Sequence, residues 1–285
     1  MDNKKKEDEL ATPRFGMLAD IARELTGEVV FPTSFDTILR LRKELQNPSL
    51  SLTRVAQVVQ LEPLVATRLM RLANSATYAA LGDPVRELPS AINRLGLNMV
   101  RSTAMAVAVG AILHAKELVG FSKLAHGLWE HSIRSAAAAR VLAKKFTRIN
   151  ADEALLAGLV HDLGAFYMLY RAVQYQELRE RPDSLIHIIK DWHEGIGVTL
   201  LETLGLPPEI VEAAIDHDQP RPIPATLKSL VDIVYVANLL TGGTQEWLQL
   251  DCEANEADIA LFQERYAELM PEIEAEAQEM RIALS

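Results

Sequence analysis

The sequence predicts an all-α protein, a multi-helical bundle with two lobes, and three observations lead to this class. Apolar residues recur mainly at helical spacing, and no convincing run of alternating apolar and polar residues indicates a strand. Proline and glycine residues divide the chain into segments of ordinary helix length. The chain has 285 residues, of which 49% are hydrophobic, so it can bury one large core or two smaller ones.

In the first half of the chain, capping residues and breakers mark several helices. Ser51 or Thr53 can cap a helix at the start of the stretch 51–81. Pro63 divides this stretch into two helices, because proline is tolerated at the first helical turn and not in the interior. A helix rich in small residues follows Gly96, and we expect it to be buried.

In the second half, five further helices are expected. Asn150 followed by Glu153 resembles a capping box, and it begins a helix that we expect to continue through the apolar stretch 155–169. The other four expected helices are one capped by Ser122 that runs to Phe146, one from about Trp192 to Leu204, one that starts at Pro207 and covers 207–218, and one over 227–240 that ends before Gly242.

Charge is distributed unevenly along the chain, and this favours a division into segments. The net charge is -10, and most of it lies after residue 250, where acidic residues far outnumber basic ones. We expect a flexible tail over 1–15, a main domain over 16–245 with lobes 16–115 and 116–245, and an acidic helical segment over 246–285. That segment is either a contact surface or a helix packed on its own body. Because the rest of the chain is nearly neutral, nucleic-acid binding is disfavoured.

Several classes of protein are excluded by what the sequence lacks. It has no run of eighteen apolar residues, so no membrane-spanning helix is expected. The first ten residues mix both charge signs and lead into no apolar region, unlike a secretory signal. A single cysteine, Cys252, excludes an internal disulfide framework and cysteine-cluster zinc sites. A cytoplasmic protein is expected.

A histidine–aspartate pair in an apolar helix raises the question of function. His161 and Asp162 lie in the middle of "LLAGLVHDLGAFYML", where burial of an unpaired carboxylate is costly. Adjacent helical positions point about 100° apart, so the two can share an ion only if it lies beside the helix. The other candidates are His131, His193 and His217, which lie on three further predicted helices, and Asp218 next to His217.

These residue types suit a transition metal, although each has a simpler interpretation. Neutral imidazoles with a carboxylate suit iron, manganese, zinc or nickel better than calcium. The His161–Asp162 pair can also hydrogen bond within itself or to the backbone. Trp129 lines a pocket or, more simply, packs between lobes. His114, His126 and His187 are interpreted as residues that bind no metal.

Several motifs, in order along the chain, resemble the HDOD family, relatives of the HD metal-dependent phosphohydrolases. They are "EPLVATRLMRLANSATY" (62–78), "LPSAINRLG" (88–96), "WEHS" (129–132), "AGLVHDLG" (157–164), "HEGIGVTLLETLGLPPEI" (193–210) and "IDHD" (215–218). The resemblance covers roughly residues 31–240. It implies a five-helix HD-like core in the second lobe. It also implies metal ligands at His131, His161 and Asp162, with His193 and His217 where related two-metal enzymes add ligands.

Three departures from the catalytic pattern of these relatives disfavour hydrolysis. Enzymes that cleave cyclic dinucleotides have a lysine where this chain has Ala165. The last aspartate of HD enzymes matches Asn238, a neutral and weaker ligand. His217 and Asp218 stand where two-metal relatives often have two histidines. We therefore predict a degenerate site, which either retains an ion in a structural role or has lost it.

The resemblance implies a bacterial signal-transduction output or adaptor module that contacts other signalling proteins. The alternative is a metal-dependent phosphohydrolase acting on a nucleotide or cyclic dinucleotide. A third interpretation treats residues 52–72 as a helix-turn-helix, with Arg54, Arg68 and Arg71 near phosphates. Pro63 in the turn and the absence of a basic bias count against DNA binding.

Overall fold

The computed structural model describes residues 16–26, 41, 45, 47, 51–79, 82–113, 116–242 and 264–284, and of residues 112, 113, 116, 117 and 119 it describes the backbone alone. Within these ranges the protein consists of helices and connecting turns, and no strand is present, so the predicted all-α class is confirmed. No helix in the described part of the chain has the length and apolar character needed to cross a membrane.

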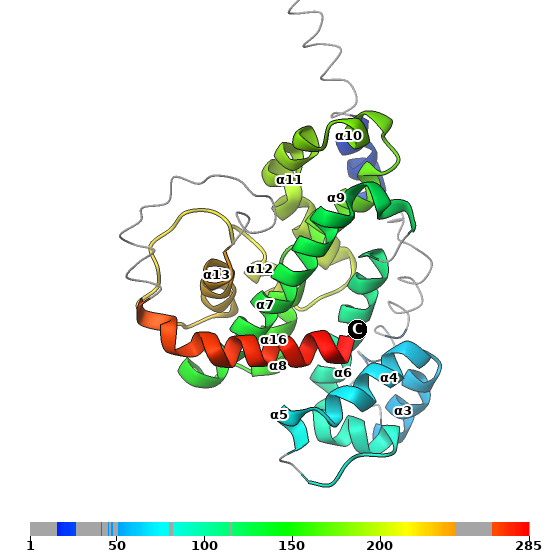
Figure 1. The fold of residues 1–285 in the computed structure, drawn as a ribbon, viewed down its shortest axis with the longest axis vertical. Helices are drawn as coiled ribbons and strands as arrows, with labels where there is room; N and C mark the ends of the chain where they lie inside the picture. The colour runs from blue at the N-terminus through cyan, green and yellow to red at the C-terminus, as the bar shows by residue number, and fades with distance from the viewer. Residues whose placement is uncertain are drawn as a thin grey trace, which may run out of the picture.

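The first set of helices forms one end of the molecule (Figure 1). Ser51 caps the first of them, because its side chain accepts a hydrogen bond from Arg54 N at 3.2 Å. Pro63 begins the next helix, and Gly96, with φ of 79°, introduces a kink into the longest one. The four helices are α3 (Leu52–Gln60), α4 (Pro63–Ala73), α5 (Ala76–Ala79) and α6 (Leu88–Leu113).

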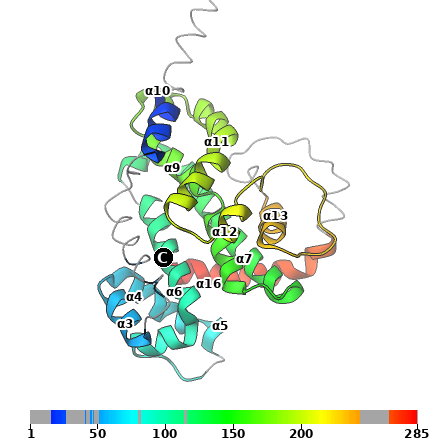
Figure 2. The same ribbon diagram turned by 180° about the vertical axis from the view of Figure 1, so that it is seen from behind.

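The second set surrounds α7, a long helix at the centre of the molecule whose alanine-rich face is buried (Figures 1 and 2). α7 contacts α6, α8, α9 and α13, so it is the element on which the interior is assembled. The elements are the 3-10 helix η1 (Lys116–Phe121), α7 (Ser122–Phe146), α8 (Ala151–Val160), α9 (Leu163–Ala172), α10 (Gln176–Glu180), α11 (Pro182–Thr203), α12 (Pro208–Ala213) and α13 (Leu230–Leu240).

The expected single helix through 155–169 is wrong, because the chain breaks at the histidine–aspartate pair. Asn150 caps α8 as predicted, accepting from the backbone N–H groups of Asp152 and Glu153. α8 ends at Val160, and α9 begins at Leu163 after Asp162 adopts φ of -97° and ψ of 18°. This break frees His161 and Asp162 from the 100° separation of adjacent helical positions.

Three other predicted boundaries also need correction. Ser122 is the first residue of α7 and not its cap, because the 3-10 helix η1 leads directly into α7. α11 begins at Pro182, ten residues before the expected start, since proline fits the first helical position. α12 ends at Ala213, and Asp216 follows in the left-handed region with φ of 53°. His217 therefore lies outside any helix.

The described part of the acidic segment packs on the body of the protein. It forms the 3-10 helix η2 (Ala267–Leu269) and α16 (Met270–Leu284), which contacts α7, α4 and α5. Arg140 on α7 pairs with Glu276, and Arg281 Nε lies 2.7 Å from Glu130 Oε2. α16 thus packs on the chain's own body, and the other interpretation, a contact surface for another protein, stays a prediction. The rest of the segment, with Cys252, and the tail 1–15 lie outside the described residues.

A close approach of α9 to α11 places the histidine–aspartate break beside the second half of the chain. A Cβ atom added to Gly164 on α9 would overlap the carbonyl oxygen of His193 and lie 2.5 Å from Gly197 N. Both are backbone atoms of α11, so neither can move aside cheaply. The absence of a side chain at Gly164 therefore sets the distance between these helices.

We expect Gly164→Ala to destabilise the protein by about 1–3 kcal/mol or more, because overpacking forces the two helices apart. Gly195→Ala on α11 is the matched control, since an added Cβ atom there meets nothing within 4 Å. It should be neutral or stabilise the helix by up to about 1 kcal/mol. Urea unfolding of both variants measures the difference. Equal free energies of unfolding for the two variants would contradict this account of the crossing.

Candidate metal centre

Five side chains named from the sequence converge at one point in the interior, and we call them the histidine–aspartate cluster. Each is 1% exposed or less. They come from two helices and two turns: His131 lies on α7 and His193 on α11, His161 and Asp162 lie in the turn between α8 and α9, and His217 lies after α12. The expectation that four histidines occupy four helices is wrong for His161 and His217, which both lie in turns.

Asp162 lies at the centre of the cluster, and each of its carboxylate oxygens faces a pair of histidines. Its Oδ2 lies 3.3 Å from His161 Nε2 and 3.6 Å from His131 Nε2. Its Oδ1 lies 3.1 Å from His217 Nε2 and 3.4 Å from His193 Nε2. Within each pair the two nitrogens are 3.3 Å apart. The geometry brings all five together, while their role as metal ligands stays a prediction.

Hydrogen bonds to the backbone orient three of the four imidazole rings. A carbonyl oxygen can only accept, so in each case Nδ1 carries the proton and donates it. This directs Nε2 into the cluster, as in histidines that bind a metal through Nε2. The three bonds run from His161 Nδ1 to Gly158 O at 2.8 Å, from His193 Nδ1 to Ile189 O at 2.8 Å and from His217 Nδ1 to Ala214 O at 2.9 Å.

The contact between His161 and Asp162 tests whether the cluster suits a cation. Burial lowers the pKa of His161 to about 4, so its ring is neutral near pH 7. Because Nδ1 holds the only ring proton, Nε2 is an acceptor, and it faces the acceptor Oδ2 of Asp162 at 3.3 Å. In this tautomer the two residues form no hydrogen bond with each other, whereas the other simpler interpretation, a hydrogen bond of His161 to the backbone, is present. Two acceptors at this distance are favourable when a cation lies between them, so the residues fit a metal ion.

The charges in and around the cluster also favour a cation. Burial by itself would raise the pKa of Asp162, but the surrounding imidazoles outweigh it and hold that pKa well below 3.8. Burial would likewise lower the pKa of His217, yet Asp218 and Asp162 raise it to about 10. The pKa of His193 is raised above 6.5 for a similar reason. A metal ion competes with protons for the same nitrogens. The negative charge of Asp162 and Asp218 therefore attracts a metal ion as well as a proton.

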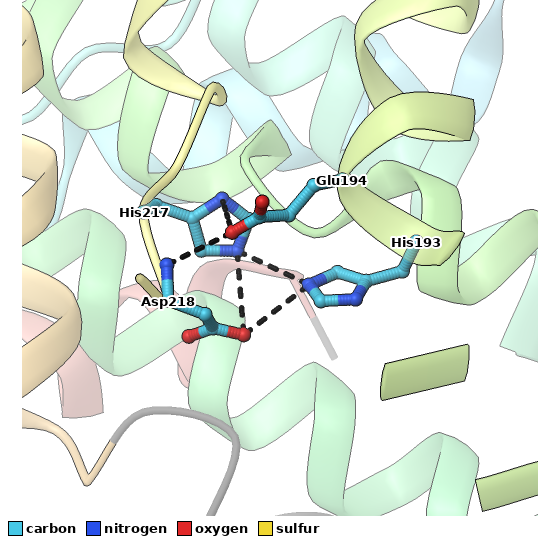
Figure 3. Close-up of side chains that lie close together, drawn as sticks. All are labelled: His193, Glu194, His217 and Asp218. Atoms are coloured by element: carbon cyan, nitrogen blue, oxygen red, sulfur yellow. Dashed lines mark hydrogen bonds and ion pairs between the residues drawn. The ribbon is translucent and has the colours of Figure 1, made fainter. Parts of the chain in front are cut away.

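A second group of donors adjoins the cluster on the side of His193 and His217 (Figure 3). Donor atoms of His193, Glu194, His217 and Asp218 lie within 4.8 Å of one another. Asp218 Oδ2 lies 3.3 Å from His193 Nε2, and Glu194 Oε1 accepts a hydrogen bond from Asp218 N at 3.0 Å. Glu194 was not predicted from the sequence, because its partner Asp218 is 24 residues further along the chain and no sequence pattern links the two.

The other two predicted pocket residues lie in different surroundings. Asn238 on α13 contacts the second group, since its Nδ2 donates to Asp218 Oδ1 at 2.8 Å and to His217 O at 3.1 Å. Trp129 packs toward α6, where a Cβ atom added to Gly110 would lie 3.8 Å from its ring. This supports packing between helices for Trp129.

The donor set determines which ions suit the site. Four imidazole nitrogens and carboxylate oxygens suit iron, manganese, zinc or nickel. Such an ion, when bound, supplies Lewis acidity and lowers the pKa of a coordinated water. Among the histidines interpreted as residues that bind no metal, His126 and His187 are exposed, and His114 lies outside the described residues.

We expect a chelator to lower the melting temperature of the wild-type protein, and His161→Ala to abolish most of this response. His126→Ala, an exposed histidine on the same helix as His131, is the matched control and should respond like the wild type. Equal chelator sensitivity in wild type and His161→Ala would contradict metal binding here. In that case the substitution should cost only packing and a hydrogen bond, about 1–3 kcal/mol.

Similar proteins are known both from sequence and from solved structures. An uncharacterised protein of Treponema pallidum (strain Nichols) is 24% identical over 245 residues, which cover 81% of this chain and 45% of that protein. The chain thus spans about half the length of this relative.

The crystal structure of a candidate metal-dependent phosphohydrolase from Shewanella amazonensis SB2B matches with a TM-score of 0.73 and 22% identity, over 96% of this chain and 100% of that one. A candidate signal-transduction protein from Marinobacter aquaeolei VT8 matches with a TM-score of 0.55 and 23% identity, over 95% of this chain and 66% of that one. At such identities these structures show the fold. Residues 31–220, more than half of the chain, match the model of the HDOD domain. The chain therefore belongs to the HDOD family.

Proposed function

We propose that this chain is an output or adaptor module of bacterial signal transduction, which acts through contacts with other signalling proteins. In this proposal the histidine–aspartate cluster holds a divalent transition metal in a structural role. Membership of the HDOD family supports the signalling role, and the description of the Marinobacter protein agrees with it. The fit of the donor set to a cation supports the metal.

The enclosure of the cluster is the observation that carries the structural role. All four imidazoles and the carboxylate of Asp162 are 1% exposed or less. A structural metal site is closed by protein ligands, whereas a catalytic site keeps a coordination position open to water or substrate. A phosphodiester substrate would have to reach atoms that the protein covers.

Two of the three departures from the catalytic pattern are also enclosed. Ala165 is fully buried, and Asn238 is 1% exposed. Hydrolysis of a phosphodiester needs positive charge on the nonbridging oxygens as well as a metal-activated water. A methyl group at Ala165 supplies no such charge. Asn238 is neutral, so it adds no anionic ligand. Its Nδ2 is engaged with Asp218 and with the backbone at His217.

A metal-dependent phosphohydrolase acting on a nucleotide or cyclic dinucleotide is the second candidate. The position of Asp162 favours it, because one carboxylate faces a donor group with each oxygen. In two-metal hydrolases a pair of ions binds both the attacking and the leaving oxygen. Burial and the departures at Ala165 and Asn238 weigh against this candidate, and turnover measurements distinguish the enzyme from the adaptor.

We expect no turnover of a generic phosphodiester, nucleotides or cyclic dinucleotides above the metal-only blank, with manganese or iron added. Loss of one charged transition-state contact costs about 3 kcal/mol, roughly a hundredfold in rate, and a missing ligand weakens the ion as well. Elemental analysis of the same sample verifies that metal is bound during the assay.

A positive result would have to come from the cluster itself. Turnover that requires metal, disappears in Asp162→Ala and persists in the control His126→Ala would replace the adaptor proposal with the enzyme. Turnover that persists in Asp162→Ala would indicate a contaminating hydrolase.

A further inference from the structure

Two of the candidate donors lie in a segment that helix geometry does not position. His217 and Asp218 belong to residues 214–219, which we call the donor loop, between the end of α12 at Ala213 and the start of α13 at Leu230. Within the loop, Asp216 has a positive φ of 53°, a conformation that residues other than glycine adopt rarely. Side-chain contacts from neighbouring helices add to the backbone hydrogen bonds of this loop, such as that from Gln219 N to Asp216 O at 3.3 Å.

Glu194 holds the donor loop from the side of α11. Its Oε1 accepts a hydrogen bond from the backbone N–H of Asp218 at 3.0 Å and lies 3.7 Å from His217 Nδ1 (Figure 3). A hydrogen bond between a carboxylate and a backbone N–H is among the stronger ones, because the acceptor is charged. Glu194 is thus anchored to the loop backbone and not only to its side chains.

Asn238 holds the same loop from the side of α13. Its Nδ2 donates to the carbonyl oxygen of His217 at 3.1 Å and to Asp218 Oδ1 at 2.8 Å. These two acceptors identify the nitrogen end of the amide group. Glu194 and Asn238 therefore contact the loop from two sides, at the two residues that carry its donor atoms.

The amide nitrogen at Asn238 fits the acceptors of the donor loop, which an aspartate would not. An aspartate here would place an oxygen 2.8 Å from Asp218 Oδ1 and 3.1 Å from His217 O, where only acceptors face it. The amide nitrogen of Asn238 is fully used by the loop, while its Oδ1 is buried and has no hydrogen-bond partner among the described residues. Donation through Nδ2 therefore holds the loop whether or not Oδ1 contacts an ion.

We propose that Glu194 and Asn238 are positioning residues, which fix His217 and Asp218 in ligand geometry before an ion binds. This inference rests on the ion binding of the proposed function and adds residues that regulate its affinity. Ordering a loop costs conformational free energy, and a loop ordered in advance spares the ion that cost. Partners of metal ligands typically alter metal affinity about 10–100-fold when they are removed.

Substitutions at Glu194 separate positioning from coordination. Glutamine keeps an oxygen that can accept from Asp218 N–H but lacks the anionic charge of a ligand, whereas alanine removes both. In a titration of Zn²⁺ against a chromophoric chelator, we expect Glu194→Ala to bind about 10–100-fold more weakly than wild type. Glu194→Gln should bind nearly as well as wild type. If glutamine weakens binding as much as alanine, Glu194 is a ligand and the proposal is wrong.

Two further variants complete the comparison. Glu202→Ala removes an exposed carboxylate from the same helix and should leave Zn²⁺ affinity unchanged. Asn238→Ala removes the hydrogen bonds to the other side of the loop and should weaken Zn²⁺ binding as Glu194→Ala does. It therefore supplies the test if Glu194→Ala fails to fold. Wild-type affinity in both folded alanine variants would overturn the proposal.

Hydrogen exchange of the metal-free full-length protein tests whether Glu194 orders the donor loop in the absence of an ion. We expect the Asp218 amide to be protected in wild type and in Glu202→Ala, and to exchange faster in Glu194→Ala. If wild type binds no Zn²⁺ and exchange still responds, the proposed metal role fails while the positioning holds. If exchange over 214–219 is the same in wild type and Glu194→Ala, the positioning fails whatever the metal titration shows.

Discussion

The buried carboxylate of Asp162 is the constraint on which the arrangement of this protein depends. A carboxylate with 1% exposure is strongly unfavourable unless other groups compensate its charge. Compensation comes from the neighbouring His161 and from imidazoles on α7, on α11 and in the donor loop, segments that lie far apart in the sequence. Displacement of any one of these segments would leave part of that charge uncompensated. The cluster is thus a tertiary contact among most of the second half of the chain.

Helices must approach closely for side chains as short as these to meet, and glycine makes this possible at two crossings. At Gly158, a Cβ atom would lie 2.7 Å from the carbonyl oxygen of Ser135, so α8 lies against the backbone of α7. Gly164 does the same for α9 and α11. These glycines flank His161 and Asp162 in sequence. The glycines that allow the close packing and the residues that supply the donors therefore belong to one short motif.

Features set by local chemistry could be predicted from the sequence, and features set by distant contacts could not. Ser51 and Asn150 cap helices as expected, because a cap depends only on residues within one turn. The cluster was expected because several motifs together resemble a known family. The break at His161 and Asp162 has no local signal, because the surrounding stretch is helical in pattern. What favours the break is the contact of Asp162 with imidazoles elsewhere in the chain. Glu194 was missed because only the fold brings it to Asp218.

A closed metal centre and a catalytic one place opposite demands on the same donors. A catalytic ion needs an open position and nearby charge for the substrate, while a closed ion is most effective when every donor comes from the protein. A ligand that binds only the folded state stabilises it by about 2.7 kcal/mol when its free concentration is a hundred times its dissociation constant. For an ion in this cluster, that free energy would act on the packing of α7, α8, α9 and α11. Burial of Ala165 and engagement of Asn238 suit this use, because both favour a stable interior over access for a substrate.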